Sequence, residues 1–266
     1  MSASTVSKVL AAAKDDGRAA LIGYLPVGFP SVEGSLRAME VLVENGVDIV
    51  EIGLPYTDPL MDGPVIQTAA TRALEGGVRV ADVFRAGRAV SATGAGALVM
   101  TYWNPVLRYG ADRFAAELAG AGVSGLITPD LVPDEAQDWL EASEAHDLDR
   151  VFLVAPSSTP ERLQSTTAAS RGFVYATALM GVTGARTSVG SAASVLVGRV
   201  REVTDLPVCV GLGVSTREQV AEVARFADGV IVGSALVRCL VDAPDPDTGL
   251  KDLGALAADL AQGVRR

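Results

Sequence analysis

Two carboxylate side chains and two glycine-rich loops are the features of this chain that could carry out chemistry. Glu51 lies within the apolar run Val-Asp-Ile-Val-Glu-Ile-Gly-Leu, and Asp62 follows 11 residues later in the segment Pro-Leu-Met-Asp-Gly-Pro. Late in the chain, Gly211-Leu-Gly-Val-Ser215 and Gly233-Ser234 offer backbone N–H groups of the kind that bind phosphate. Together these features predict acid–base chemistry on a phosphorylated small molecule.

Glu51 is predicted to point away from the helices that cover its strand. Side chains alternate along a strand, so Val47, Ile49 and Glu51 share one face, while Val50 and Ile52 share the other face and suit packing against helices. Burial of Glu51 would raise its pKa, so that the group could donate and retrieve a proton near neutral pH. A structural glutamate paired with an arginine is the alternative interpretation.

Asp62 lies in a segment with too many prolines to be helical, and we expect it to be solvated and ionised. The following glycine leaves a simpler interpretation open, because Asp-Gly is common in turns. Asp58, in Tyr-Thr-Asp-Pro, fits either a turn or a surface contact.

The elements that must position these residues follow from eight repeats of an apolar run and a segment with helical spacing. The runs are rich in Val, Ile and Leu without clear alternation, as in parallel strands buried on both faces. Predicted strands are 19–25, 47–54, 97–102, 125–129, 150–155, 173–178, 207–211 and 229–232. Predicted helices are 31–45, 80–92, 111–121, 134–146, 160–169, 191–203, 215–225 and 234–241, with an extra one at 3–14 and a closing one at 250–265. This α/β pattern predicts a single domain over residues 1–266, a (β/α)₈ TIM barrel with an extra N-terminal helix.

A barrel of this kind places its active site at the carboxyl ends of the strands. The residues that fall there are Glu51, Asp62, Tyr102, Asp130, Tyr175 and both glycine loops. The loops after strands seven and eight are the usual phosphate site of such barrels. The glycine-rich stretch 181–190 after strand six is either a plain loop or a lid that excludes water.

Composition narrows the chemistry further. The net charge of −10 argues against nucleic acid and anionic membranes as partners, and no apolar run is long enough to span a bilayer. We therefore expect a cytoplasmic protein, with Cys209 and Cys239 as reduced thiols. None of the three lysines lies at a strand end, and His146 is the single histidine, so we expect neither a Schiff base nor a metal. No dinucleotide motif follows the first strand, and no cofactor is expected.

Several motifs along nearly the whole chain resemble those of the tryptophan synthase alpha subunit family. The longest is Val-Glu-Ile-Gly-Leu-Pro-Tyr-Thr-Asp-Pro-Leu-Met-Asp-Gly-Pro-Val-Ile-Gln at 50–67. Others are Gly-Tyr-Leu-Pro-Val-Gly-Phe-Pro at 23–30, Tyr-Trp-Asn-Pro at 102–105, Thr-Pro-Asp-Leu at 128–131 and Gly-Val-Thr-Gly-Ala-Arg at 181–186. Met61, Phe29, Tyr56, Thr57, Met100 and Leu212 depart from the family's usual residues.

The resemblance implies retro-aldol cleavage of indole-3-glycerol phosphate to indole and glyceraldehyde 3-phosphate. Glu51 then matches the family's general acid–base, and Asp62 matches the carboxylate that holds the indole N–H. Further matching positions are Tyr24, Met100, Ile127 and Leu212 around the indole ring, Tyr175 and Thr183 in the site, and Gly184, Gly213, Gly233 and Ser234 at the phosphate.

The resemblance also implies a partner, a pyridoxal-phosphate beta subunit in an α₂β₂ tetramer. Pro55, Asp58 and Asn104 match positions at that contact. Three alternatives remain: a free-standing indole-3-glycerol phosphate lyase that releases indole, another phosphosugar barrel enzyme such as an isomerase, and an inactive barrel that only binds a partner.

Overall fold

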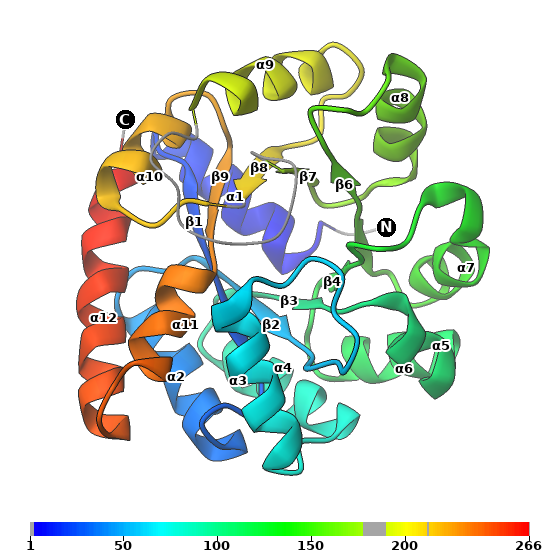
Figure 1. Ribbon diagram of the computed structural model, residues 1–266. Helices are drawn as coiled ribbons and strands as arrows, with labels where there is room; N and C mark the ends of the chain where they lie inside the picture. The colour runs from blue at the N-terminus through cyan, green and yellow to red at the C-terminus, as the bar shows by residue number, and fades with distance from the viewer. Residues whose placement is uncertain (1–2, 178–189, 212, 266) are drawn as a thin grey trace.

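Parallel strands curl into a barrel surrounded by helices (Figure 1) in a computed structural model that describes residues 3–177, 190–211 and 213–265. The strands are β1 Ala20–Pro26, β2 Ile49–Gly53, β3 Gly96–Met100, β4 Gly125–Ile127, β5 Asp149–Val151, β6 Leu153–Val154, β7 Val174–Thr177, β8 Val208–Gly211 and β9 Gly229–Val232. Their order in the sheet is β5-β4-β3-β2-β1-β9-β8-β7-β6, and every pairing is parallel. The predicted TIM barrel is confirmed.

The predicted fifth strand, 150–155, closes the barrel in two pieces. β5 pairs with β4, whereas β6 pairs with β7, so the chain changes partner at Phe152. At the other junction β1 pairs with both β2 and β9. Each predicted apolar run therefore forms a strand, with bounds that differ from the prediction by a few residues.

Helices cover the outside of the sheet. They are α2 Val32–Glu44, α3 Pro64–Glu75, α4 Val80–Ala92, α5 Trp103–Tyr109, α6 Ala111–Gly120, α7 Gln137–Ala145, α8 Pro160–Ala169, α9 Gly190–Arg201, α10 Arg217–Ala224, α11 Ser234–Val241 and α12 Pro246–Gly263, with the 3₁₀ helix η1 Pro133–Glu135. The helices α3 and α5 were not predicted. Proline obscured α3, although Pro64 stands in its first turn, where no N–H is needed. None of the helices in the described part of the chain combines the length and apolar character that a membrane span requires.

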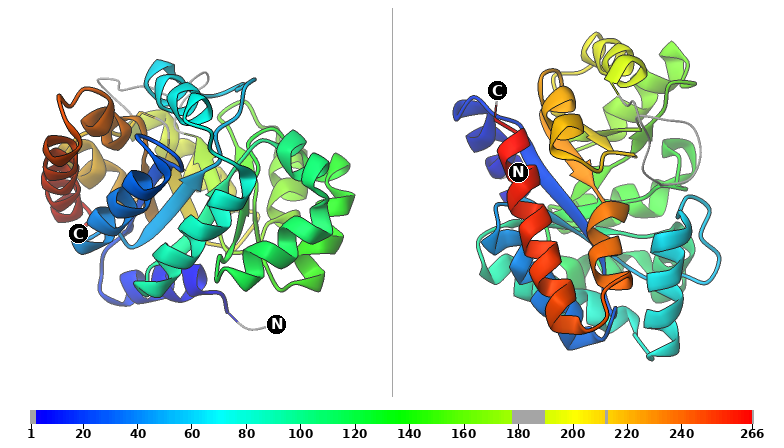
Figure 2. Two further views of the ribbon diagram at one scale, coloured as in Figure 1. Left: turned by 90° about the horizontal axis from the view of Figure 1, so that it is seen from below. Right: turned by 60° about the vertical axis from the view of Figure 1, so that its left-hand side comes forward.

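The extra N-terminal helix, α1 Thr5–Asp15, covers the amino-terminal end of the barrel (Figure 2). Val6, Leu10 and Ala13 are buried in it and pack with inward-facing strand residues such as Ile22 and Leu98. The helix is also tied down by hydrogen bonds, because the Ser4 hydroxyl donates to the Asp149 carboxylate at 2.5 Å. With this end closed, the opposite end of the barrel is the one that can admit a ligand.

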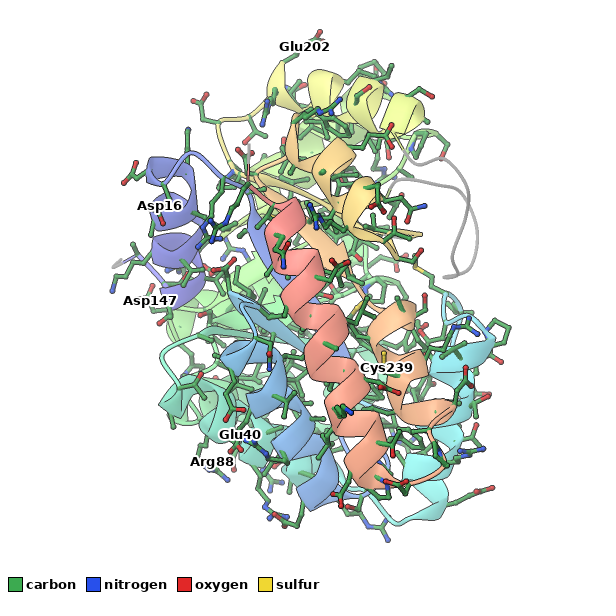
Figure 3. All side chains as sticks on the ribbon, turned by 90° about the vertical axis from the view of Figure 1, so that its left-hand side faces the viewer. Asp16, Glu40, Arg88, Asp147, Glu202 and Cys239 are labelled. Atoms are coloured by element: carbon green, nitrogen blue, oxygen red, sulfur yellow. The ribbon has the colours of Figure 1, made fainter. Side chains whose placement is uncertain are left out.

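Apolar packing between sheet and helices forms the larger part of the core. Both cysteines are free thiols: Cys209 is buried on β8, and Cys239, on α11 beside α12 (Figure 3), is half-buried.

Candidate active site

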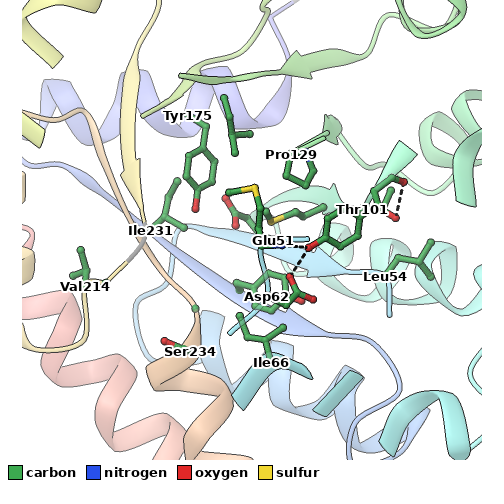
Figure 4. Close-up of a pocket in the computed structure, with 17 residues that line it drawn as sticks. Glu51, Leu54, Asp62, Ile66, Thr101, Pro129, Tyr175, Val214, Ile231 and Ser234 are labelled. Carbon is green, nitrogen blue, oxygen red and sulfur yellow. Dashed lines mark hydrogen bonds between the residues drawn. The ribbon is translucent and has the colours of Figure 1, made fainter. Parts of the chain in front are cut away.

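A pocket opens at the carboxyl ends of the strands (Figure 4). It is lined by Tyr24, Glu51, Leu54, Met61, Asp62, Ile66, Met100, Thr101, Tyr102, Pro129, Leu153, Tyr175, Gly213, Val214, Ile231, Gly233 and Ser234. The lining joins both predicted carboxylates to both glycine loops.

Glu51 points into this pocket from β2, as the alternation of its strand predicted. The residue is 1% exposed, and Oε1 has no hydrogen-bond partner among the described residues. Burial raises the pKa of the carboxyl to about 8, because the charged form loses its hydration. None of the ion pairs of the described residues includes Glu51, so the alternative of a structural pair with arginine has no support there. A proton can thus be held, released and retrieved at this position near neutral pH.

Asp62 lies in the loop between β2 and α3 and faces the same pocket. The structure differs from the expectation of a solvated side chain: Asp62 is half-buried, and burial raises its pKa, which a hydrogen bond from Tyr102 partly offsets. The Tyr102 hydroxyl donates to Asp62 Oδ1 over 2.9 Å. Two carboxyl groups in one pocket therefore have different surroundings, which is the pattern of a proton donor beside a charged group.

Two tyrosines pack beside Glu51 over glycines of neighbouring strands. A Cβ atom at Gly53 would collide with the Tyr24 hydroxyl, and one at Gly211 would collide with the Tyr175 hydroxyl. Burial raises the pKa of both tyrosines well above the ordinary value, so that both stay neutral. The two glycines are needed here for close approach rather than for backbone freedom.

The two glycine loops line the same pocket as the carboxylates. Gly213 has φ of 96°, a left-handed conformation that L side chains rarely adopt. Gly233 is the N-cap of α11 and Ser234 its first residue, so the positive end of this helix faces the pocket. Backbone N–H groups and a hydroxyl at this point suit a phosphate.

Some predicted residues lie elsewhere. Ile127 is fully buried among the inner residues of the barrel and is not part of the pocket lining, whereas Pro129, two residues later, is. Thr183, Gly184 and the predicted lid up to residue 189 fall within 178–189, outside the described residues, and the last lid residue, Gly190, begins α9. Leu212 is also outside the described residues.

The three predicted partner-contact residues differ in exposure. Pro55 is buried, whereas Asp58 is exposed and accepts a hydrogen bond of 2.6 Å from the Thr57 hydroxyl. Asn104 is exposed and its Nδ2 donates to the Tyr56 hydroxyl over 2.9 Å.

Sequence reasoning missed the roles of several pocket residues. Tyr102 was placed at the correct end of its strand, but its hydrogen bond to Asp62 was not predicted. Leu153 and Ile231 line the wall, and strand alternation could have indicated both. His146 ends α7 and contacts Asp112 Oδ1 at 2.8 Å, away from the pocket lining. Within the described ranges, no group of His, Cys, Asp and Glu side chains could hold a metal ion.

Comparison with known proteins agrees with this geometry. The model of the family "Tryptophan synthase alpha chain" matches residues 10–265. The alpha chain of Salinispora arenicola is 65% identical over 253 residues, 95% of each chain. That of Mycobacterium ulcerans is 62% identical over 264 residues, 99% of this chain and 96% of its own.

Solved structures give the same result. Tryptophan synthase from Mycobacterium tuberculosis superimposes with a TM-score of 0.93 and 59% identity over 100% of both chains. Tryptophan synthase subunit alpha from Legionella pneumophila does so with a TM-score of 0.88 and 32% identity over 99% of both. The chain therefore belongs to the tryptophan synthase alpha chain family.

Proposed function

We propose that this chain cleaves indole-3-glycerol phosphate to indole and glyceraldehyde 3-phosphate, using Glu51 and Asp62 and no metal, nicotinamide or pyridoxal group. Membership of the family makes it a lyase of tryptophan biosynthesis. The observation that carries the residue assignment is the buried Glu51, which shares one pocket with Asp62 and with the loops of Gly213 and Ser234.

Protonated Glu51 begins the reaction by donating its proton to C3 of the indole ring. The positive charge that develops on the ring nitrogen is stabilised by the Asp62 carboxylate, which accepts the indole N–H. The carboxylate of Glu51 then takes the proton of the adjacent glycerol hydroxyl. That oxygen becomes the aldehyde carbonyl, and the electron pair of the breaking carbon–carbon bond returns to the ring.

The pKa of about 8 for Glu51 suits this sequence, because the group starts protonated and serves as the base one step later. The value of kcat/KM should fall as the pH rises through about 8, because Glu51 then loses its proton. The substrate's phosphate is assigned to the backbone of Gly213 and Gly233 and to Ser234, at the N-terminus of α11. The apolar wall formed by residues such as Met100 and Ile66 suits the indole ring.

A beta subunit is the proposed partner, in an α₂β₂ tetramer in the cytoplasm. Its support lies in the resemblance and in two large apolar side chains at the face that carries Asp58 and Asn104. Leu60, in the loop after β2, is 71% exposed, and Leu107, on α5, is 52% exposed. This loop and α5 are in contact through the hydrogen bond from Asn104 Nδ2 to the Tyr56 hydroxyl. Apolar side chains exposed in one patch are typical of a protein interface.

The test is an assay of the purified chain with indole-3-glycerol phosphate, with and without the beta subunit from the same source. We expect stoichiometric indole and glyceraldehyde 3-phosphate, the same rate after a chelator, and no adduct trapped by borohydride. Indole release at full rate without any binding of the beta subunit would support the free-standing lyase instead. Failure to release indole under either condition would refute the proposal.

A further inference from the structure

The hydroxyl of Tyr102 joins two loops at the wall of the pocket. Tyr102 is buried at the N-cap of α5, just after β3. Its hydroxyl donates to Asp62 Oδ1 over 2.9 Å and accepts a hydrogen bond from the backbone N–H of Met61 over 3.0 Å, as the dashed lines in Figure 4 mark. One hydroxyl therefore fixes both the carboxylate and the backbone immediately before it.

Tyr102 is itself held on two sides. The ring of Tyr56 packs against it with centroids 5.5 Å apart, and the Tyr56 hydroxyl accepts from Asn104 Nδ2 over 2.9 Å. The next backbone N–H, of Trp103, donates to both carboxylate oxygens of Asp130, at 2.9 and 3.1 Å. A tyrosine anchored in this way has little freedom to turn, so it can impose an orientation on the group that it contacts.

We infer that Tyr102 is a positioning residue for Asp62, holding Oδ1 so that Oδ2 is presented to the indole N–H. The inference rests on the proposed function, since it assigns a task to the same carboxylate. Tyr102 acts through Asp62 and is not assigned a contact with the reacting atoms.

The hydrogen bond should also keep Asp62 ionised. Burial favours the protonated carboxyl and raises its pKa, whereas a donated hydrogen bond favours the charged form and lowers the pKa. Burial raises the pKa of Tyr102 far above its ordinary value, so the phenol remains a donor over the working pH range. A charged Asp62 is what a positively charged indole intermediate requires.

The variant Tyr102→Phe separates this role from simple packing, because the ring stays and only the hydroxyl is lost. We expect kcat/KM for indole-3-glycerol phosphate to fall roughly 10- to 100-fold, the range for a hydrogen bond to a charged group. The acid limb of the kcat/KM profile should move to higher pH, because Asp62 then holds its proton more tightly. Inhibition by glycerol 3-phosphate should be unchanged, since that probe occupies the phosphate end.

Tyr109→Phe is the matched control. Tyr109 ends α5 and packs against Phe84 and Phe114, away from the pocket lining, and its variant also loses a single hydroxyl. We expect the pH profile of kcat/KM for Tyr109→Phe to match that of the wild type. Thermal unfolding of both variants shows whether each chain is folded at the assay temperature.

A double-mutant cycle tests whether Tyr102 acts through Asp62. In an Asp62→Asn chain, Tyr102→Phe should cause little further loss, because the charged acceptor is already gone. The inference would be overturned if the acid limb of Tyr102→Phe superimposed on that of the wild type, or if the losses of the two single variants multiplied in the double variant. Indole cleavage by the wild type would still support the proposed function in either case. If the wild type itself releases no indole, the proposed function fails first.

Discussion

The buried carboxyl group of Glu51 is the residue on which both activity and stability should depend. Placing a carboxylate in the pocket is unfavourable unless it is protonated, and no described group donates to Oε1. The same burial that prepares the group for proton transfer therefore reduces the stability of the fold as the pH rises. Asp62 differs because a donor, Tyr102, stabilises its charged form.

Replacing Glu51 with glutamine should stabilise the chain at neutral and mildly alkaline pH. The folded chain holds the Glu51 proton up to about pH 8, whereas the unfolded chain releases it near the ordinary value of 4.5. Stability of the wild type therefore falls between these two pH values, and the amide escapes that loss. The Tm of Glu51→Gln should exceed that of the wild type by roughly 5–10 °C at pH 8 and by little at pH 4.5. Glu202→Gln, at an exposed carboxyl (Figure 3), is the control, and equal Tm differences for the two variants would contradict the burial of Glu51.

Gly213 offers a second test at the scale of the residue. Its φ of 96° is unfavourable for a side chain by about 1–2 kcal/mol, and a side chain there would also block the approach of a phosphate. Gly213→Val should raise KM roughly 10-fold or more. Gly94, with φ of 86° and open space around it in the turn before β3, supplies a control with the same backbone strain. If Gly94→Val raises KM as much, the phosphate does not bind at Gly213.

The residues that the sequence could place are those governed by local rules. The alternation of side chains along an apolar strand was enough to predict that Glu51 points into the barrel, because helices cover the other face of the strand. The contact between Asp62 and Tyr102 was beyond such rules. The two residues are 40 positions apart, and their meeting depends on how two neighbouring loops fold over the rim. The half-burial of Asp62 was misjudged for the same reason.

At the scale of the element, the strands were easier to predict than the short helices near the pocket. Long apolar runs specify buried parallel strands, and all eight runs formed them. The helices α3 and α5 both begin near prolines, which weakens their helical pattern, and the fifth strand changes partner at Phe152. Loop-rich regions beside an active site carry fewer local signals than the scaffold does.

Helix α1 should support the barrel without taking part in catalysis. Leu10 is 3% exposed and packs with the inner residues at the end of the barrel opposite the pocket. Leu10→Ala should lower the free energy of unfolding by about 2–5 kcal/mol. Urea unfolding measures that loss, and kcat/KM at a temperature where the variant is folded should match the wild type. A loss of kcat/KM in folded protein would show that the two ends of the barrel are coupled.

At the scale of the whole molecule, a chain with net charge of −10 must still attract a phosphorylated substrate. Local dipoles at the N-terminus of α11 can do so irrespective of the total charge. Leu60 is exposed on the loop that also carries the pocket residues Met61 and Asp62, so a partner that covers this loop would lie beside the substrate.

The variant Leu107→Glu should weaken binding of the beta subunit by about 10-fold or more, because a charge replaces an apolar side chain that the complex would bury. Titration of labelled beta subunit measures the Kd, and the rate of the isolated chain should be unchanged. Val195→Glu on α9, at a valine that is 64% exposed, is the control on another part of the surface. Equal effects of the two changes would remove Leu107 from the interface.

The most direct measurement is the rate of indole release by Glu51→Gln compared with the wild type, at the same temperature and pH and with circular dichroism confirming the fold. An amide of the same shape cannot give or retrieve the proton, so kcat should fall about 10²–10⁴-fold, while binding of glycerol 3-phosphate is retained. Turnover within twofold of the wild type in folded protein would contradict the assignment of Glu51 as the acid–base group.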